Sequence, residues 1–496
     1  MATPSKRKFL ETARQGRVPP LHKEIPYAPP RSIYEPLAFK NSFLLESVKG
    51  PEKIARYSFI GFDPCLTFKA GNGVIDIQQR ENYGFLRTGP LRALRSLIEA
   101  YVQEPFEHLG PFQGGLVGIL GYDFVHYLES LPEKAADDLR LPDCHFLMID
   151  KLIAFDHILR KCWIIVCPGV TDAMTMGTPP ATIEWSQKYD EAALDIAVIE
   201  EKIKSRKSAA SGITNTHKSS ANIDVVYEMK KKEYMDIVKR AKEYIAAGDI
   251  FQANLSQRLS ASLRSASPWN LYRILSDINP SPFAAFLDLG DYQIVSSSPE
   301  RLLRLKGRTI ETRPIAGTRP RGRDRREDEV MRRELLLNEK ERAEHIMLID
   351  LERNDLGRVS EYGSVKVDEL MITEDYSHVI HIVSNVSGDL AAGKDCFDAI
   401  RAAFPGGTIT GVPKVRCMEI IDELEPVKRG PYTGSIGYIA FSGNMDLNIV
   451  IRSFVISKGR VYVQAGAGIV ADSDPEREYF ESLKKAEALV RTLEKV

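Results

Sequence analysis

The sequence predicts an α+β fold, and three observations lead to that prediction. Short apolar segments bounded by turn residues recur along the chain and are typical of β-strands. Segments with helical periodicity alternate with these strands irregularly, which disfavours a doubly wound parallel sheet. With 496 residues the chain is too long for one ordinary core, so two or more domains are expected.

One polar segment, residues 207–222, divides the chain. It is rich in Ser, Ala, Thr and Asn, and its single large apolar residue is Ile213. Such a segment cannot bury enough apolar surface to order itself. We therefore predict an N-terminal region at 1–206, a linker at 207–222 and a C-terminal domain at 223–496.

Individual elements follow from local patterns. In the N-terminal region, residues 147–157 and 162–168 are predicted as β-hairpin strands. In the C-terminal domain, a long charged helix is predicted through 327–351, with further strands on both sides of it. The last helix is well marked, because Asp474 can cap it and Pro475 suits its first turn.

Charge and composition exclude several classes of protein. Lys plus Arg number 67 and Asp plus Glu 68, and this balance argues against a nucleic-acid or anionic-membrane surface protein. The six cysteines form no C-x-x-C pair or zinc-ligand cluster, which favours a reduced, cytoplasmic protein. No run of eighteen apolar residues is present, and the basic start lacks an apolar signal core.

The segment "TRPIAGTRPRG", residues 312–322, combines three arginines with Pro and Gly. We expect Arg313, Arg319 and Arg321 to meet an anion, since guanidinium groups bind carboxylates and phosphates well. The residue at the centre of this basic segment, Ala316, carries no reactive group.

Three glutamates are candidate metal ligands. Glu478 and Glu481 share one face near the start of the last helix, and Glu344 lies where a charged helix becomes apolar. Carboxylates that enter a buried region need a partner, and Mg²⁺ is a suitable one. The alternative, that all three are solvated helix charges, stays open at this point.

Other polar residues interrupt apolar or glycine-rich segments. His378 and His381 lie in an apolar segment, where a histidine is more often a core residue than a general acid. Thr408 lies in a loop without the G-K-[ST] element of a phosphate-binding loop. Arg452 is expected inside an apolar strand, paired with a bound anion or a buried carboxylate.

Gly466 and Gly468 interrupt a strand, where bare amides could hold a carboxylate or where a β-bulge could lie. Their spacing is not that of a dinucleotide fingerprint. Together the cationic, amide and carboxylate groups outline a pocket for a small polycarboxylate ligand.

Six motifs carry a family resemblance: "RPIAGTRPRG", "AEHIMLIDLERNDLGRV", "GTITGVPKVRCMEIIDELEP", "RGPYTGSIGY", "NMDLNIVIRSFV" and "VQAGAGIVADSDPEREYFESL". They resemble the chorismate-utilising enzymes, and among these the large subunits of anthranilate synthases. The resemblance covers most of 223–496 and continues more loosely in front. It implies an α+β chorismate-binding fold, an antiparallel β-sandwich flanked by helices.

The resemblance also implies roles for individual residues. Glu344 and Glu481 resemble the Mg²⁺ ligands, His381 resembles the residue that helps the C4 hydroxyl leave, and Thr408 lines the pocket. The residues that resemble the chorismate contacts are Gly317, Thr318, Tyr432, Arg452, Gly466, Ala467 and Gly468.

Ala316 distinguishes reactions within this family. In relatives that add water at C2 or form a covalent link to the ring, a lysine occupies this position and can act as base or nucleophile. Alanine can do neither, so the resemblance implies space for ammonia beside C2. No cysteine has the setting of a glutaminase nucleophile, so a separate glutamine amidotransferase subunit is the expected partner.

The resemblance implies a tryptophan inhibitor site as well. Ser47 lies on one of its walls and Pro282, Phe283 and Ala284 on the other. Phe283 and Ala284 replace an aromatic hydroxyl and a larger apolar residue, so weak or absent inhibition is expected.

Two alternatives to anthranilate formation stay open. The segment "PFAAFL" leans toward aminodeoxychorismate synthase, the folate-branch relative, whereas Ala316 favours anthranilate synthase. A non-catalytic anion-binding relative is the third possibility.

Overall fold

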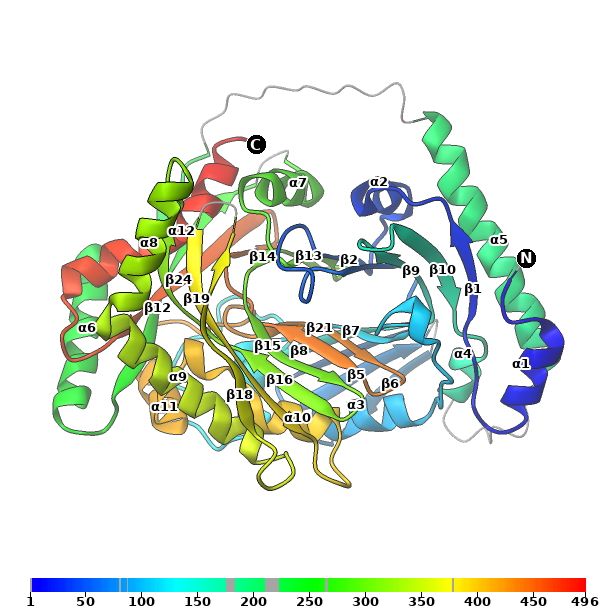
Figure 1. The fold of residues 1–496 in the computed structure, drawn as a ribbon, viewed down its shortest axis with the longest axis horizontal. Helices are drawn as coiled ribbons and strands as arrows, with labels where there is room; N and C mark the ends of the chain where they lie inside the picture. Colours follow the sequence, from blue (N-terminus) through cyan, green and yellow to red (C-terminus); the bar gives the residue numbers. More distant parts are fainter. Residues whose placement is uncertain are drawn as a thin grey trace.

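The computed structural model describes residues 2–79, 82–86, 88–174, 183–209, 223–263, 266–376 and 379–496. Within them, two large sheets lie face to face and helices cover their outer faces and ends (Figure 1). The predicted α+β class with antiparallel sheets is confirmed, since every pairing between named strands is antiparallel.

The first sheet takes strands from both parts of the sequence. Its order is β1 (Leu21–Ile25), β10 (Lys161–Val166), β9 (Lys151–Asp156), β3 (Tyr57–Gly61), β2 (Ser42–Glu46), β13 (Phe283–Asp288), β14 (Tyr292–Ser298), β23 (Ser453–Ser457), β24 (Arg460–Ile469), β12 (Gln252–Ser262) and β11 (Val226–Tyr227), with β20 (Gly411–Val412) also on β12.

The second sheet also takes strands from both parts of the sequence. Its order is β17 (Ile315–Pro320), β19 (Val379–Asp389), β16 (Thr309–Arg313), β15 (Arg301–Lys306), β22 (Met445–Asn448), β21 (Ser435–Ala440), β7 (Gly115–Leu120), β8 (Cys144–Ile149), β4 (Leu66–Gly71), β5 (Val74–Gln79) and β6 (Asn82–Leu86), with β18 (Lys366–Asp375) also on β19.

The α-helices are α1 (Lys6–Ala13), α2 (Pro30–Tyr34), α3 (Pro90–Glu99), α4 (Val170–Ala173), α5 (Trp185–Ala209), α6 (Lys231–Ala246), α7 (Pro268–Ile278), α8 (Arg325–Leu337), α9 (Glu339–Gly357), α10 (Cys396–Ala403), α11 (Lys414–Leu424) and α12 (Pro475–Leu493). Short 3₁₀ helices include η3 (Tyr122–Tyr127) and η6 (Gly407–Ile409).

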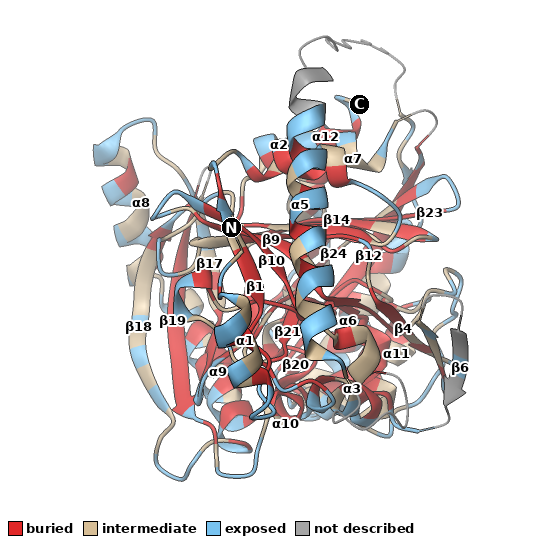
Figure 2. Ribbon diagram, turned by 90° about the vertical axis from the view of Figure 1, so that its right-hand side faces the viewer, coloured by how far each residue is buried: buried red, intermediate tan, exposed pale blue. Residues whose placement is uncertain are grey.

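Burial explains why these layers hold together. The strands between the layers are largely buried, whereas α5 turns an exposed face outward (Figure 2). One apolar cluster runs through residues of both sheets and of the helices packed on them, and a second fills the space around β7, β8 and β9. Burial of this continuous apolar surface is the main stabilising contribution to such a fold.

One local prediction about the N-terminal region needs correction. Residues 147–157 form two strands, β8 and β9, which separate at Asp150 and enter different sheets. Segment 162–168 supplies β10, which pairs with β9 as expected. Both sheets contain strands from either side of 207–222, so the two predicted regions share both sheets. Residues 207–209 end α5, and 210–222 lie outside the described residues.

The helices of the C-terminal part follow their sequence signals closely. The Asp474 carboxylate accepts the N–H groups of Glu476 and Arg477 at 3.1 and 2.9 Å, and Pro475 is the first residue of α12, as predicted. The charged segment 327–351 is not one helix. It breaks at Asn338, whose side chain accepts the Glu341 N–H at 3.0 Å and caps α9.

Candidate functional site

The predicted site residues gather where an end of each sheet meets two helices. Strands β12 and β24 come from the first sheet, β17 and β19 from the second, and α9 and α12 close the space (Figure 1). A hydrogen bond of 3.1 Å from Gln252 Nε2 on β12 to Glu344 Oε1 on α9 ties these elements together.

His381 lies on β19 opposite Thr318 of β17. Its Nδ1 is 3.0 Å from Thr318 Oγ1 and 3.2 Å from the Gly317 carbonyl oxygen. A carbonyl can only accept, so this contact places the proton on Nδ1 and leaves Nε2 unprotonated in the neutral ring. Burial lowers the pKa of His381 to about 4, although the hydrogen bond that the ring donates to the Gly317 carbonyl opposes the shift, so the ring is neutral at pH 7.

Glu300 is a site residue that the sequence analysis did not single out. It is buried just after β14, where the Thr408 hydroxyl and the Ile315 N–H face its carboxyl group. Burial raises the pKa of Glu300 to about 7, although both neighbouring donors oppose the shift. Its only sequence signal is a carboxylate between two apolar strands in "SSSPERLLRL".

Ala316 is one residue along the chain from the backbone group that faces this buried acid. It follows Ile315, whose N–H faces Glu300, and it pairs with Ile382 of β19. The strand register shifts between Ala316 and Thr318, where Gly317 has a φ of +64°. This left-handed conformation favours glycine. Position 316 carries only a methyl group, one residue beyond the backbone N–H that faces Glu300.

The glycine segment of β24 packs against Tyr432. A Cβ atom on Gly466 would lie 2.6 Å from the Leu255 carbonyl oxygen, 2.7 Å from Asn254 Oδ1 and 3.0 Å from the Tyr432 hydroxyl. A Cβ atom on Gly468 would lie 2.5 Å from Gln252 Nε2. Only glycine allows the side chains of β12 and Tyr432 to approach the strand this closely.

Arg452 does not lie inside a strand, as was expected, but directly before β23 with a φ of +54°. Its Nη1 donates to the Lys485 carbonyl oxygen of α12. Burial lowers the pKa of the Arg452 guanidinium, and Tyr432 is the group that opposes this shift. No carboxylate in the described part of the chain forms an ion pair with it, so the guanidinium is suited to bind an anionic ligand.

The two predicted metal ligands are electrostatically coupled. Burial raises the pKa of Glu344, and the nearby Glu481 carboxylate raises it further. Glu481, which is exposed, pairs with Lys485 Nζ at 3.0 Å. Two carboxylates that repel each other fit a hard divalent cation. No group of three or more His, Cys, Asp or Glu in the described ranges is arranged to hold a metal, so water and an anionic ligand would have to complete the shell.

The three arginines around Ala316 are not available to an anion, which corrects the expectation from the sequence. Arg313 pairs with Glu369 at 2.6 Å and Glu374 at 2.5 Å, Arg319 with Glu341 at 2.7 Å, and Arg321 with Asp328. The Arg313 pairs connect β16 to β18, and the pairs of Arg319 and Arg321 connect β17 and the residue after it to α9 and α8. Charge alone could not have shown that each guanidinium already has a carboxylate partner.

The remaining predicted residues are those of the tryptophan site, together with Glu478 and His378. The two walls predicted for tryptophan meet, because β2 pairs with β13 and Ser47 Oγ donates to the Pro282 carbonyl oxygen at 3.1 Å. Phe283 packs its ring 5.2 Å from the Arg301 guanidinium, and Ala284 is buried in the core. Glu478 is buried at the start of α12, and His378 lies outside the described residues.

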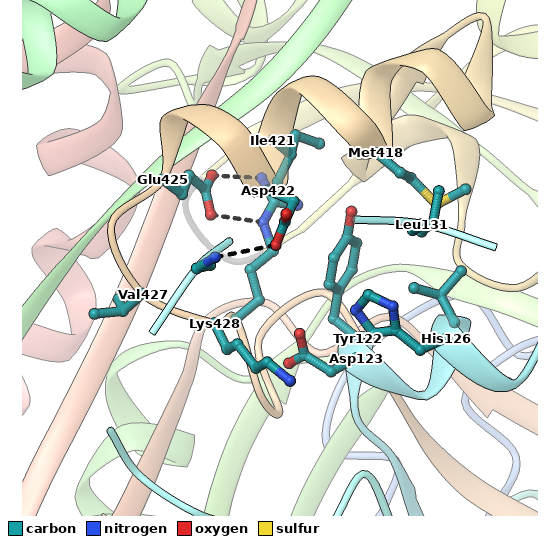
Figure 3. A pocket seen from close by; sticks show the side chains of 13 residues that line it. Tyr122, Asp123, His126, Leu131, Met418, Ile421, Asp422, Glu425, Val427 and Lys428 are labelled. Atoms are coloured by element: carbon teal, nitrogen blue, oxygen red, sulfur yellow. Dashed lines mark hydrogen bonds and ion pairs between the residues drawn. The ribbon is translucent and has the colours of Figure 1, made fainter. Parts of the chain in front are cut away.

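Two hollows in the structure contain none of these predicted residues. One is a groove of about 460 Å³ lined by Lys40, Lys151, Lys202 and neighbouring residues. The other lies between η3 and α11 and measures about 20 Å³, which is room for a single water (Figure 3). The second cavity is too small for a ring acid, although it lies behind the turn that carries Tyr432.

Comparison with known proteins identifies the family. A family model described as chorismate binding enzyme matches residues 40–491. The chain is 44% identical over 479 residues to aminodeoxychorismate synthase component 1 of Bacillus subtilis (96% of this chain, 97% of that protein). It is 45% identical over 455 residues to anthranilate synthase component 1 of Acetivibrio thermocellus (91% and 90%).

A solved structure agrees with these sequence matches. The crystal structure of anthranilate synthase component I from Streptococcus pneumoniae aligns with a TM-score of 0.75 and 34% identity, covering 88% of this chain and 92% of that one. Across the described ranges, no helix is both long enough and apolar enough to span a membrane. A match over nearly the whole chain leaves one conclusion: the chain belongs to the chorismate binding enzyme family.

Proposed function

We propose that this chain is the chorismate-converting subunit of an anthranilate synthase. In the proposed reaction, chorismate and ammonia give anthranilate, pyruvate and water. The observation that carries the proposal is Ala316, which follows Ile315, whose N–H faces the buried Glu300, and whose own side chain offers neither a base nor a nucleophile. The several relatives named anthranilate synthase component 1 support the same reading.

Substrate recognition follows from the charges of the site. Chorismate carries two carboxylates, and Arg452 is a guanidinium without a carboxylate partner in the described part of the chain. The amides around Gly466 and Gly468 and the Tyr432 hydroxyl can supply further donors. Glu344 and Glu481 would hold Mg²⁺, which would neutralise a substrate carboxylate when bound.

Proton movement can be assigned to two buried groups. Addition of ammonia at C2 forms a C–N bond, shifts the ring double bonds and breaks the C4–O bond. The departing hydroxyl takes up one proton and leaves as water, while the new ammonium group releases one. Glu300 is protonated in about half of the molecules near pH 7, and a bound dianion would raise the pKa of both Glu300 and His381. These two side chains are the candidate proton donors.

Loss of the ring C2 proton and of the enolpyruvyl group as pyruvate would complete the reaction. Thr408 faces the Glu300 carboxyl group and would orient it in both steps.

Ammonia is proposed to come from a separate glutamine amidotransferase subunit. All six cysteines are buried, and burial raises the pKa of the thiols of Cys65, Cys144, Cys167, Cys396 and Cys417. A buried thiol with a raised pKa is a poor nucleophile, so the chain has no evident glutaminase centre of its own. Tryptophan is proposed to bind against Ser47, Pro282, Phe283 and Ala284, with weak or absent inhibition.

One of the similar proteins supports a second candidate function. The 44% identical relative from Bacillus subtilis is named aminodeoxychorismate synthase component 1. That reaction would place the amino group at C4 and retain the enolpyruvyl group, so the two functions differ in product.

The test is the product formed by the purified chain with chorismate, MgCl₂ and ammonium sulfate at alkaline pH. We expect fluorescent anthranilate and one equivalent of pyruvate. Aminodeoxychorismate without pyruvate would replace the proposal by the alternative. An Ala316→Lys variant should lose at least 90% of the anthranilate rate, since the added amine would fill the space beside Glu300; an undiminished rate would contradict the role given to Ala316.

A further inference from the structure

Arg429 is a fully buried charge that the proposed chemistry does not use. It lies in the turn after α11, and its side chain is 1% exposed. All five of its N–H donors are engaged. They reach Glu425 Oε2 (2.9 Å) and Oε1 (2.6 Å), the Ile409 carbonyl (3.0 Å), Thr433 Oγ1 (3.3 Å) and the Asn254 carbonyl (2.6 Å).

Apart from Glu425, the acceptors are next in sequence to residues that line the proposed chorismate site or pack against it. Ile409 follows Thr408, Thr433 follows Tyr432, and Asn254 precedes Leu255, whose carbonyl oxygen limits the space at Gly466. The Arg429 guanidinium thus joins three walls of the site, which come from η6, the turn before β21, and β12.

The guanidinium itself is held from behind. The Glu425 carboxylate accepts the Ser256 N–H at 2.8 Å and the Ser256 hydroxyl at 2.9 Å in addition to Arg429. The Arg429 guanidinium also packs 4.9 Å from the Tyr122 ring and 5.6 Å from the Tyr432 ring. Glu425 and Tyr122 face the small cavity from opposite sides (Figure 3).

The turn is fixed from the side of η3 as well. The Asp123 carboxylate accepts the Gly430 N–H at 2.7 Å, and the Tyr122 N–H donates to the Gly430 carbonyl at 2.6 Å. Thr433, with a φ of +60°, donates its hydroxyl to the Tyr432 carbonyl at 2.5 Å. These contacts fix the backbone on both sides of Tyr432.

We propose that Arg429 is a positioning residue which sets the chorismate-binding geometry by locking Tyr432, the Thr408 loop and the Gly466 backbone to one another. A buried ion pair is weak evidence for a stabilising role, because desolvation opposes the attraction of the charges. The five hydrogen bonds of the Arg429 guanidinium instead fix the positions of the three walls of the site relative to one another. The proposal rests on the proposed function for the identity of the ligand.

Arginine is required here for its shape as well as its charge. A lysine would keep the positive charge but has three donors on one atom, so it cannot reach all three walls from one planar group. Arg429→Lys should therefore keep the positive charge but lose the hydrogen bonds that join η6, the turn before β21 and β12 to one another.

The test compares Arg429→Lys with a matched control, Arg258→Lys. Arg258 is also buried, with its guanidinium on Asp138 and Glu228, but none of its contacts reaches the site. Dissociation of chorismate is measured by calorimetry with MgCl₂ and without ammonia, and KM is measured separately for chorismate and for ammonium.

We expect Arg429→Lys to raise the chorismate Kd and KM at least tenfold and to leave the ammonium KM within twofold. Arg258→Lys should lower the melting temperature comparably and leave both KM values within twofold. A fall in kcat at unchanged chorismate Kd, or equal effects of the two variants on the chorismate Kd, would overturn the proposal.

A milder variant covers the case in which Arg429→Lys does not fold. Thr433→Val keeps the shape of the side chain and removes one acceptor of Arg429 together with the bond to the Tyr432 carbonyl. We expect about a fivefold rise in the chorismate Kd, from the loss of these two buried hydrogen bonds. An unchanged Kd would refute the positioning role. If wild-type protein does not bind chorismate, the proposed function fails first and is recognised by that result.

Discussion

The close packing at Gly466 allows a quantitative prediction for Gly466→Ala. The added methyl carbon would lie 2.6 Å from the Leu255 carbonyl oxygen and 3.0 Å from the Tyr432 hydroxyl. Both distances are shorter than an ordinary van der Waals contact. The Leu255 carbonyl belongs to β12, which pairs with β24 along its length, so it cannot move without disturbing the sheet. The strain therefore falls mainly on Tyr432 and on the Asn254 side chain.

The size of the effect can be worked out from overpacking. One extra methyl group in a well-packed site costs about 1–3 kcal/mol. If this strain is relieved by displacement of Tyr432, the same free energy is lost from chorismate binding. Since about 1.4 kcal/mol corresponds to a tenfold change, the chorismate Kd should rise about 5- to 150-fold.

The measurement is chorismate binding by calorimetry, together with denaturant unfolding of the free protein. Gly357→Ala is the matched control, because a Cβ atom there meets nothing within 4 Å and the residue ends α9. Gly468→Ala should affect both substrate and metal, since Gly468 is a proposed chorismate contact and its Cβ would displace the Gln252 side chain, which donates to Glu344. A Gly466→Ala protein that binds chorismate within twofold of the parent would show that the glycine segment does not form the substrate site.

Three further predictions concern the metal, the buried acid and the regulatory pocket. Glu344→Gln should raise the MgCl₂ concentration for half-maximal turnover at least tenfold, whereas the exposed Glu476→Gln on α12 should not; equal responses would remove Glu344 from the metal site. Because the folded protein holds the Glu300 proton up to about pH 7 while the unfolded chain loses it near 4.5, Glu300 lowers the unfolding free energy as pH rises through this window. Glu300→Gln should remove that slope, so its stability relative to the parent should improve by about 3 kcal/mol between pH 4.5 and 7.5 in urea unfolding, and parallel pH curves would contradict the assignment. Ser47→Ala, which loses the bond to Pro282, should change the tryptophan concentration for half-inhibition at least threefold; identical strong inhibition in both proteins would place the inhibitor elsewhere.

Sequence patterns that depend on interactions within a few residues predicted the structure correctly. Asp474 and Pro475 marked the start of α12, and this fixed the position of Glu481 in the second turn of the helix. Ala316 could be recognised as the chemically distinctive position because the residue type alone shows that its side chain carries no reactive group. In each case the determining interactions, a cap or a helical face, lie within four residues of one another.

Sequence patterns predicted less well where a side chain or strand has its partner far away in the sequence. The arginines at 313, 319 and 321 carry the charge expected of an anion site, but Glu369, Glu341 and Asp328 already neutralise them. Segment 147–157 has the composition of one strand, yet it divides at Asp150 between two sheets whose other strands lie far away in the chain.

The sequence by itself therefore determined the α+β class, the family, the capped helix that carries Glu481 and the inert residue at position 316. Only the tertiary structure decided that Glu300 is buried facing Thr408 and the Ile315 N–H, and that Arg429 joins three walls of the site. The physical reason is that capping and periodicity are local, whereas the burial of a carboxylate and the satisfaction of five guanidinium donors depend on segments that meet only when the two sheets pack.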